Sequence, residues 1–388
     1  MTGGSRDVWI FDPVAAAKKG APGATVTALW QIARKHLDLF MTDSSGIIWS
    51  TWWEAGPGWQ YWNPIHPEQK SAPGAKVNAA WAPYDSNHLD LIMTSSDGTV
   101  FSCYWDINLG WLKWSPISPS QRMNPGAPVT MIWAPYSQSH LDLFGTGGDG
   151  SVWGAYWDKT IGWTKWSAIE NQQKLYPGTE ISAIWNKIKP YNLNLFATAS
   201  DGTVYNSFWG ESTGWHGWVA IHAEQKFKPG AKVTALLAAY DETHIDLFVT
   251  DALGIVWSTY RTEGPWNKWT SIYGPRRFAP GTTISAIWAA YSSTHLDLFV
   301  TGNDGAAWST WLDTEKGWRD WSLINPEQKG AIGAEITPVW SVTTATHLDL
   351  FMCGSDGLFF FELVGNENWV DCLVSSCWRL PLGAWPPP

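Results

Sequence analysis

The residues with the clearest capacity for chemistry are histidines that are followed two positions later by aspartate. Six such pairs occur in the sequence, beginning at His36, His88, His140, His244, His295 and His347. A His–Asp pair can move protons or help to bind a metal ion. These pairs are spread over separate repeats, so they cannot converge on one centre. We therefore interpret each pair as a hydrogen bond that fixes its own repeat.

No catalytic motif accompanies the pairs. Gly-x-Ser-x-Gly, His-Glu-x-x-His, glycine-rich phosphate loops and acidic calcium loops are absent from the sequence. Ser95-Ser96-Asp97-Gly98 has glycine directly after aspartate, which is typical of a hairpin turn and differs from the Ser-x-Asp-x-Gly box of sialidases. The sequence therefore predicts no enzyme, no catalytic residue, no metal site and no cofactor.

Tryptophan is the second residue type with functional potential, because the chain contains 32 of them. An indole ring needs an apolar wall and a partner for its N–H, so regular spacing indicates repeated cores or repeated binding sites. Two sets are interpreted as core. They are the last residues of the first strands (Trp30, Trp81, Trp133, Trp185, Trp288 and Trp340) and the second tryptophans of the fourth strands (Trp62, Trp114, Trp166, Trp218, Trp269 and Trp321).

The remaining aromatic residues are expected on one face. In a four-stranded up-and-down unit, the loop between strands one and two and the loop between strands three and four open on the same side, and loops on a rigid scaffold often bind ligands. Aromatic rings suit the C–H face of a sugar, while histidine, asparagine and main-chain groups suit its hydroxyls. The alternative for each residue is packing between neighbouring units. The candidate sugar-binding residues are Trp53, Trp59, Tyr84, His88, Trp105, Trp111, Tyr136, His140, Trp157, Trp163, Trp209, Trp215, Tyr240, His244, Trp266, Tyr291, His295 and Trp318.

These residues belong to a unit that recurs seven times. His-Leu-Asp-Leu-Phe or a close variant begins at intervals of 52 residues, with one interval of 51, and Asn192 begins the fourth copy. The motif alternates as a strand does, and an Asp-Gly turn such as Asp149-Gly150 usually follows it. Residues 129–169 contain four strand-like segments joined by short turns, which is the size of a propeller blade.

The repeat count predicts an all-β fold: a seven-bladed β-propeller of four-stranded antiparallel blades. Residues 7–14 match the last strand of a unit, so we expect the N-terminal strand to complete the seventh blade and close the ring. The whole propeller is expected to be one domain, residues 1–369. Residues 370–388 do not fit the repeat and are expected to form a C-terminal tail.

Composition limits the partners. The formal net charge is −10 and no basic cluster is present, which argues against nucleic acid. No run is long enough to insert into a membrane, and residues 1–7 lack the apolar region of a secretory signal peptide. We expect a soluble protein that is cytoplasmic or is secreted by another route. The four cysteines do not form a disulfide framework, although Cys372 and Cys377 could pair.

The motifs together resemble the Photorhabdus-type seven-bladed β-propeller lectins. The resemblance rests on Val-Thr-Ala-Ile-Trp, His-Leu-Asp-Leu-Phe, Asp-Gly-x-Val-Trp-Ser-Thr-Tyr-Trp, Gly-Trp-x-x-Trp and Pro-Gly-Ala, and it covers residues 7 to about 363. It implies a ring with shallow sugar sites between blades that bind L-fucose, galactose-type or O-methylated sugars on glycans, without catalysis or a required metal. It also implies dimers or larger homo-oligomers.

Several repeats depart from this pattern. Asn192 and Asn194 replace His and Asp, Leu237 replaces a first-strand tryptophan, and Arg261 and Leu312 interrupt the column of Trp53, Trp105, Trp157 and Trp209. Fewer than seven sites are therefore expected to work. Two other functions stay open: a scaffold for protein interactions, which predicts one large patch, and a glycan-acting enzyme, which requires a carboxylate pair that the sequence lacks.

Overall fold

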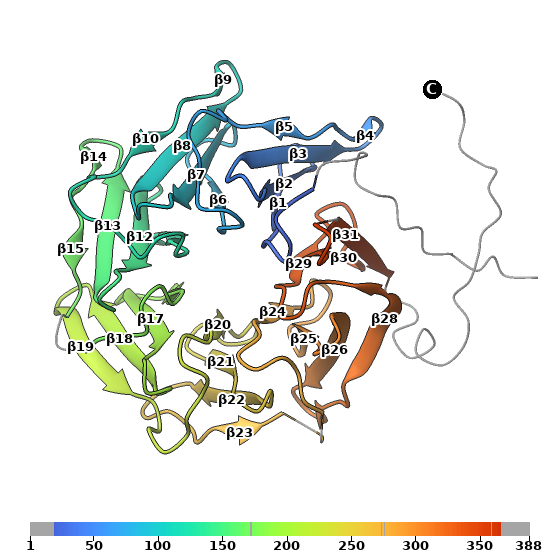
Figure 1. The fold of residues 1–388 in the computed structure, drawn as a ribbon. Coiled ribbons are helices and arrows are strands. Elements are labelled where there is room, and N and C mark those ends of the chain that lie inside the picture. Colours follow the sequence, from blue (N-terminus) through green and yellow to red (C-terminus); the bar gives the residue numbers. More distant parts are fainter. Residues whose placement is uncertain (1–18, 171–172, 273, 275, 358, 366–388) are drawn as a thin grey trace, which may run out of the picture.

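The computed structural model describes residues 19–365 except 171–172, 273, 275 and 358, and all of its regular elements in this part are strands. The strands form antiparallel sheets arranged around a central axis (Figure 1). The inner strands follow one another around this axis, and the last of them lies beside the first. This arrangement is a β-propeller.

The strands of the first six sheets, called blades 1–6 here, have the following bounds. Blade 1 contains β1 (Thr27–Gln31), β2 (His36–Thr42), β3 (Ile48–Glu54), β4 (Gly58–Trp59) and β5 (Asn63–Pro64). Blade 2 contains β6 (Asn78–Trp81), β7 (His88–Thr94), β8 (Val100–Asp106), β9 (Gly110–Trp111) and β10 (Ser115–Pro116). Blade 3 contains β11 (Thr130–Trp133), β12 (His140–Thr146), β13 (Val152–Asp158), β14 (Gly162–Trp163) and β15 (Ser167–Ala168). Blade 4 contains β16 (Ser182–Trp185), β17 (Asn192–Thr198), β18 (Val204–Gly210) and β19 (Gly214–Ala220). Blade 5 contains β20 (Thr234–Leu237), β21 (Ile245–Thr250), β22 (Val256–Arg261) and β23 (Thr270–Ser271). Blade 6 contains β24 (Ile284–Trp288), β25 (His295–Thr301), β26 (Ala306–Asp313), β27 (Gly317–Trp318) and β28 (Ser322–Lys329).

The seventh repeat differs from the others. It contributes β29 (Thr337–Trp340), β30 (His347–Cys353) and β31 (Phe359–Gly365), which form a sheet of three strands. The prediction of a seven-bladed propeller with four-stranded blades is therefore wrong, because only six sheets in the described part of the chain have the full four rows. The predicted closing strand, residues 7–14, and the predicted tail, residues 370–388, lie outside the described residues.

The outer row of most blades is broken into two short strands. In blade 1, β4 and β5 both pair with β3, so together they form the fourth row. In blade 4 the same row is the single strand β19, which has a register shift opposite Asn206 and Phe208. The expected meander of four rows is thus confirmed for blades 1–6.

The Asp-Gly turns are built as the sequence indicates. Gly150 has φ of +77°, and a Cβ there would lie 2.2 Å from the Leu175 carbonyl oxygen. Glycine is required by both the dihedral angle and the space. Asp149 Oδ1 accepts a hydrogen bond of 2.9 Å from the Ser151 amide, which fixes the turn. The turn joins β12 to β13, as predicted, and His140 lies opposite Asp158.

The hydrophobic core lies mainly between adjacent blades. One cluster combines Phe40 and Ile65 of blade 1 with Leu89 and Leu91 of blade 2, all at most 1% exposed. Tryptophans of the outer row link the blades by hydrogen bonds: Trp166 Nε1 donates to the Ile117 carbonyl at 3.1 Å, and it is 7% exposed. Trp114, Trp218 and Trp269 make the same contact to the preceding blade. Their predicted place in the core is confirmed.

A second set of hydrogen bonds runs around the axis. A polar side chain on each inner strand donates to a main-chain carbonyl in the next sheet. The seven donor–acceptor pairs are Thr27–Val77, Asn78–Val129, Thr130–Ile181, Ser182–Val233, Thr234–Ile284, Ser285–Ile336 and Thr337–Val26. The last pair, at 2.6 Å, joins the three-stranded sheet to blade 1. The ring is therefore closed at the axis by residues that the sequence analysis did not select.

We expect Thr337→Val to lower the free energy of unfolding by about 1 kcal/mol, because it removes one hydrogen bond at nearly constant shape and leaves the Val26 carbonyl without that donor. Urea denaturation followed by tryptophan fluorescence measures this change. Thr337→Ser is the matched control, since Ser182 and Ser285 occupy equivalent positions in two other sheets. Equal losses for valine and serine would show that the hydroxyl does not contribute to closure.

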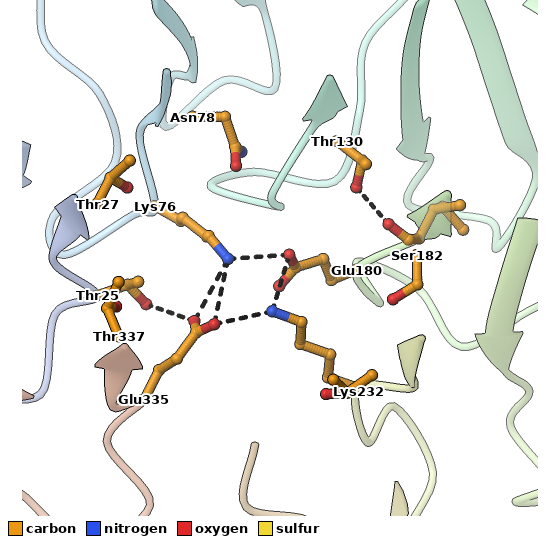
Figure 2. A network of polar contacts seen from close by, with 12 residues as sticks. Thr25, Thr27, Lys76, Asn78, Thr130, Glu180, Ser182, Lys232, Glu335 and Thr337 are labelled. Carbon is orange, nitrogen blue, oxygen red and sulfur yellow. Dashed lines mark hydrogen bonds and ion pairs between the residues drawn. The ribbon is translucent and has the colours of Figure 1, made fainter. Parts of the chain in front are cut away.

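Four charged residues, each just before an inner strand, meet at the centre of the ring (Figure 2). Lys76 Nζ lies 3.0 Å from Glu180 and 3.4 Å from Glu335, while Lys232 Nζ lies 3.2 Å and 2.8 Å from the same two carboxylates. Thr25 Oγ1 donates to Glu335 at 3.1 Å. The four side chains are only 14–17% exposed, so this cluster, which we call the channel cluster, is mostly shielded from water.

Two further expectations concern cysteines and membranes. Cys103 and Cys353 are buried free thiols, as expected for strand positions, whereas Cys372 and Cys377 lie outside the described residues. In the part of the chain that the structure describes, no helix is long and apolar enough to cross a membrane.

Candidate functional site

The predicted functional residues gather at the blade ends where the first loop and the last turn meet. In blade 1, Gln31 pairs with His36, His36 with Glu54, and Glu54 with Gly58. The loop after β1 and the turn after β3 therefore open on the same face. This confirms the topological argument that selected the candidate residues.

The histidines at this face are held by their aspartates. In each of the six pairs, His Nε2 lies 3.0–3.2 Å from Oδ1 of the aspartate two residues later. Burial raises the pKa of Asp38, Asp142, Asp297 and Asp349, and the histidine opposes that shift. The predicted His–Asp hydrogen bond is confirmed, so one nitrogen of His88, His140, His244 and His295 is already occupied.

The same histidine rings stack on an aromatic residue of the third strand. The ring centroids of His140 and Tyr156 lie 4.5 Å apart at 18°, and His88 stacks on Tyr104 at 4.6 Å. His244 and His295 repeat this contact with Tyr260 and Trp311. The stacking aromatics were not among the predicted residues. Their regular position, one residue before the third-strand column, was the signal that could have identified them.

Two blade interfaces contain a complete set of three aromatic side chains. Between blades 2 and 3, the ring centroid of Tyr84 lies 5.8 Å from that of Trp133 and 5.9 Å from that of Trp157, with the second pair stacked. Between blades 3 and 4, Tyr136 lies 5.4 Å from Trp185 and 6.4 Å from Trp209. We call these two sets the aromatic triads.

Each triad joins a loop tyrosine of one blade to two strand ends of the next. Trp133 and Trp157 meet edge to face at 6.3 Å, and Trp185 and Trp209 do so at 5.6 Å. The tryptophans are thus fixed by packing, while Tyr136 remains 41% exposed. Trp185 is buried and Trp133 is half-buried, which agrees with their predicted core role.

The tryptophans that open the outer row pack on the preceding sheet. Trp111 meets Phe40 edge to face at 5.8 Å, and Trp163 Nε1 donates to Ser102 Oγ at 3.2 Å. Four more make the phenylalanine contact: Trp59 with Phe351, Trp215 with Phe144, Trp266 with Phe196 and Trp318 with Phe248. All are half-buried, so this column contributes to the blade interfaces as well as to the candidate face.

The other interfaces hold only part of the triad. Tyr240 contacts Trp288 at 5.5 Å and Tyr291 contacts Trp340 at 5.6 Å, but Leu312 stands at the third-strand position that a tryptophan has in the triads. Between blades 1 and 2, the guanidinium of Arg34 lies 5.5 Å from the ring of Trp105 in place of a tyrosine. Trp53 meets Trp30 at 5.8 Å within blade 1. The repeats therefore produce unequal sites, as their sequence departures indicate.

The comparisons with known proteins identify the fold. No protein-family model and no curated protein matches the sequence. Among solved structures, the chain is similar to the BP39L lectin from Burkholderia pseudomallei, with 20% identity and a TM-score of 0.80 over 89% of this chain and 96% of that one. AofleA from Arthrobotrys oligospora matches with 13% identity and a TM-score of 0.58 over 81% and 89% of the two chains.

A third similar structure is the fucose-specific lectin from Aleuria aurantia, with 14% identity and a TM-score of 0.53 over 78% of this chain and 96% of that one. The Aleuria aurantia lectin is described as a six-bladed β-propeller. These likenesses establish that the present chain has the β-propeller fold.

Proposed function

We propose that this chain is a multivalent lectin, a protein that binds sugars without altering them. Its ligands are glycans that carry L-fucose, galactose-type or O-methylated sugars. The aromatic triads between blades 2 and 3 and between blades 3 and 4 form the principal sites, with weaker sites at the interfaces that hold part of a triad.

The observation that carries this proposal is the geometry of the triads. Trp209, which is half-buried and held edge to face on the buried Trp185, presents an apolar surface, and the accessible Tyr136 with its hydroxyl stands beside it. Burial and the carboxylate of Asp142 raise the pKa of Tyr136 to about 12, so its hydroxyl keeps its proton at neutral pH and can donate to a sugar oxygen. Such a surface suits the C–H face of a pyranose.

The similar structures support the same class of ligand. SapL1, a lectin solved with α-methyl fucoside, has 16% identity and a TM-score of 0.53 over 81% of this chain. The Aleuria aurantia protein is fucose-specific. BP39L, SapL1 and the Aleuria aurantia protein are described as lectins, which favours binding over catalysis for this chain as well.

We expect Tyr136→Ala to remove one sugar site while the others keep their affinity. Isothermal titration with the sugar that binds best on a glycan array should give one site fewer per chain than the parent. Tyr136→Phe keeps the ring on Trp185 and should retain the site with weaker binding. An array without any bound sugar would overturn the lectin proposal, and an unchanged number of sites in Tyr136→Ala would remove this triad from it.

A further inference from the structure

The interface between blades 4 and 5 differs from the others at four positions at once. Asn192 and Asn194 stand where the other repeats have histidine and aspartate, Leu237 replaces the first-strand tryptophan, and Arg261 stands in the third-strand column. The register of β17 and β22 places these residues at the same blade ends as the aromatic triads. These changes place a positively charged side chain at a position where the aromatic triads have a tryptophan.

Two contacts hold the guanidinium of Arg261. Its Nη2 donates to Asn194 Oδ1 at 3.0 Å across the interface, and its central carbon lies 4.7 Å from the ring centroid of Trp266. Asn194 is itself 4% exposed and its carbonyl oxygen is also 3.5 Å from Asn206 Nδ2. The cation is therefore positioned by a buried amide on one side and an indole face on the other.

The described residues provide no negative charge to pair with this cation. Among the residues that the structure describes, no carboxylate forms an ion pair with Arg261, although the chain as a whole is acidic. Arg261 is half-buried, and burial lowers its pKa. Burial of a cation without an anionic partner costs free energy, and a bound anion would offset that cost. The other six repeats have an aspartate at the position of Asn194, and an aspartate there would supply a negative charge.

The N–H groups of Arg261 that do not contact Asn194 indicate the chemistry of the ligand. A guanidinium has five N–H donors in a rigid planar fork that matches a carboxylate or a sulfate. One donor is used by Asn194, so the rest remain available at a partly exposed position. Trp266 beside it is half-buried and can contact the apolar face of a ring.

We propose that the interface between blades 4 and 5 binds the anionic group of an acidic sugar, with Arg261 as the recognising residue. The inference extends the proposed function in taking the ligand to be a sugar, but it concerns a separate interface with a different chemical preference. The neutral-sugar sites lie at the aromatic triads and do not contain Arg261.

The test compares a charged sugar with its uncharged analogue on the intact protein. Isothermal titration should show that methyl glucuronide binds at least about tenfold more tightly than its amide. That preference should shrink when the salt concentration rises from about 50 mM to about 500 mM, because added ions screen the contact. Galactose 6-sulfate forms a second arm that separates a sulfate ester from a carboxylate as the source of the anion. Equal affinity for charged and uncharged sugars in both arms would overturn the proposal.

Two variants and one control locate the effect. Arg261→Gln should abolish the preference for the charged sugar. Asn194→Asp should do the same by pairing with Arg261, and it restores a residue that six repeats already tolerate at this position. Arg319→Gln is the matched control, because Arg319 also lies over an indole, at 5.0 Å from the ring of Trp311, but is exposed at another blade. A folded Asn194→Asp variant that keeps the preference would contradict the assignment.

Binding of α-methyl fucoside separates this inference from the lectin proposal. If all variants bind the fucoside as the parent does and only the charged sugar loses affinity, both proposals stand. If the fucoside does not bind but the acidic sugar does, the triad assignment fails alone. If the fucoside binds and no acidic sugar is preferred, the interface between blades 4 and 5 has no anion site.

Discussion

Glu335→Ala is expected to lower the free energy of unfolding by about 3 kcal/mol, because it leaves two mostly buried ammonium groups with a single carboxylate. Glu335 accepts from Lys76, Lys232 and Thr25, so no other member of the channel cluster can take its place. Guanidinium denaturation monitored by circular dichroism measures the loss. Glu335→Gln keeps the shape and should recover little of it, since the missing element is the charge.

The effect should depend on pH in a defined direction. Although burial alone would raise it, the pKa of Glu335 is held well below its usual value by Lys232 and Lys76. A carboxylate with a depressed pKa in the folded state stabilises the fold above its unfolded pKa near 4.5 and loses this contribution as the pH falls through the folded value. The parent and Glu335→Gln should therefore differ most at neutral pH and approach each other in strong acid.

An exposed ion pair provides the control for this result. Lys174 lies 2.8 Å from Asp149, and both side chains are about half exposed or more. Lys174→Ala should cost less than about 1 kcal/mol, because water screens such pairs. If Glu335→Ala cost no more than Lys174→Ala at pH 7, the channel cluster would not stabilise the ring.

The second large effect concerns avidity. Replacing Tyr84 and Tyr136 together by alanine should reduce capture of the protein on a fucosylated surface by roughly a hundredfold, although we expect each triad to bind a single sugar with only about −4 to −5 kcal/mol. The two proposed principal sites are lost at once, so only the weaker sites at the other interfaces remain to hold one ring at several points. Surface plasmon resonance at low ligand density and at high ligand density separates single-site affinity from avidity.

The tyrosines are chosen because removing them disturbs the fold least. Trp111 and Trp215 pack on phenylalanines of the preceding blade, and Trp163 donates to Ser102, so alanine at these positions would weaken the interfaces themselves. Tyr61→Ala is the control, because Tyr61 is a highly exposed tyrosine outside the triads. If the folded double variant were captured as well as the parent, the sugar would bind elsewhere, with the face of the Asp-Gly turns as the next candidate.

Much of the blade could be predicted from the sequence because its signals are local. The alternation in His140–Phe144 and the Asp149-Gly150 turn fix strand register, and the structure shows both. The His–Asp bonds and the buried outer-row tryptophans were also predicted correctly. The number of complete blades was not, because the seventh repeat loses its Gly-Trp-x-x-Trp segment and its described strands form a sheet of only three.

The ring-level contacts could not be predicted in the same way. Each residue of the channel cluster, and Thr25, precedes an inner strand, but nothing local shows that the strands bring the two lysines and Thr25 within 3.4 Å of a carboxylate. The substitutions at Asn194 and Arg261 were visible as departures from the repeat. Only the packing of blade 4 against blade 5 shows that the two side chains contact each other.

The channel cluster also bears on how the gene can change. Similar tandem repeats can recombine out of register, and such an event removes or adds one whole repeat. Two positive and two negative charges, carried by repeats two, five, four and seven respectively, balance only in this combination. Loss of the fourth repeat would leave Lys76 and Lys232 facing Glu335 alone, whereas loss of the third, which has Pro128 at that position, would remove no charge. Deletion of the fourth repeat should therefore destabilise the centre of the ring much more than deletion of the third.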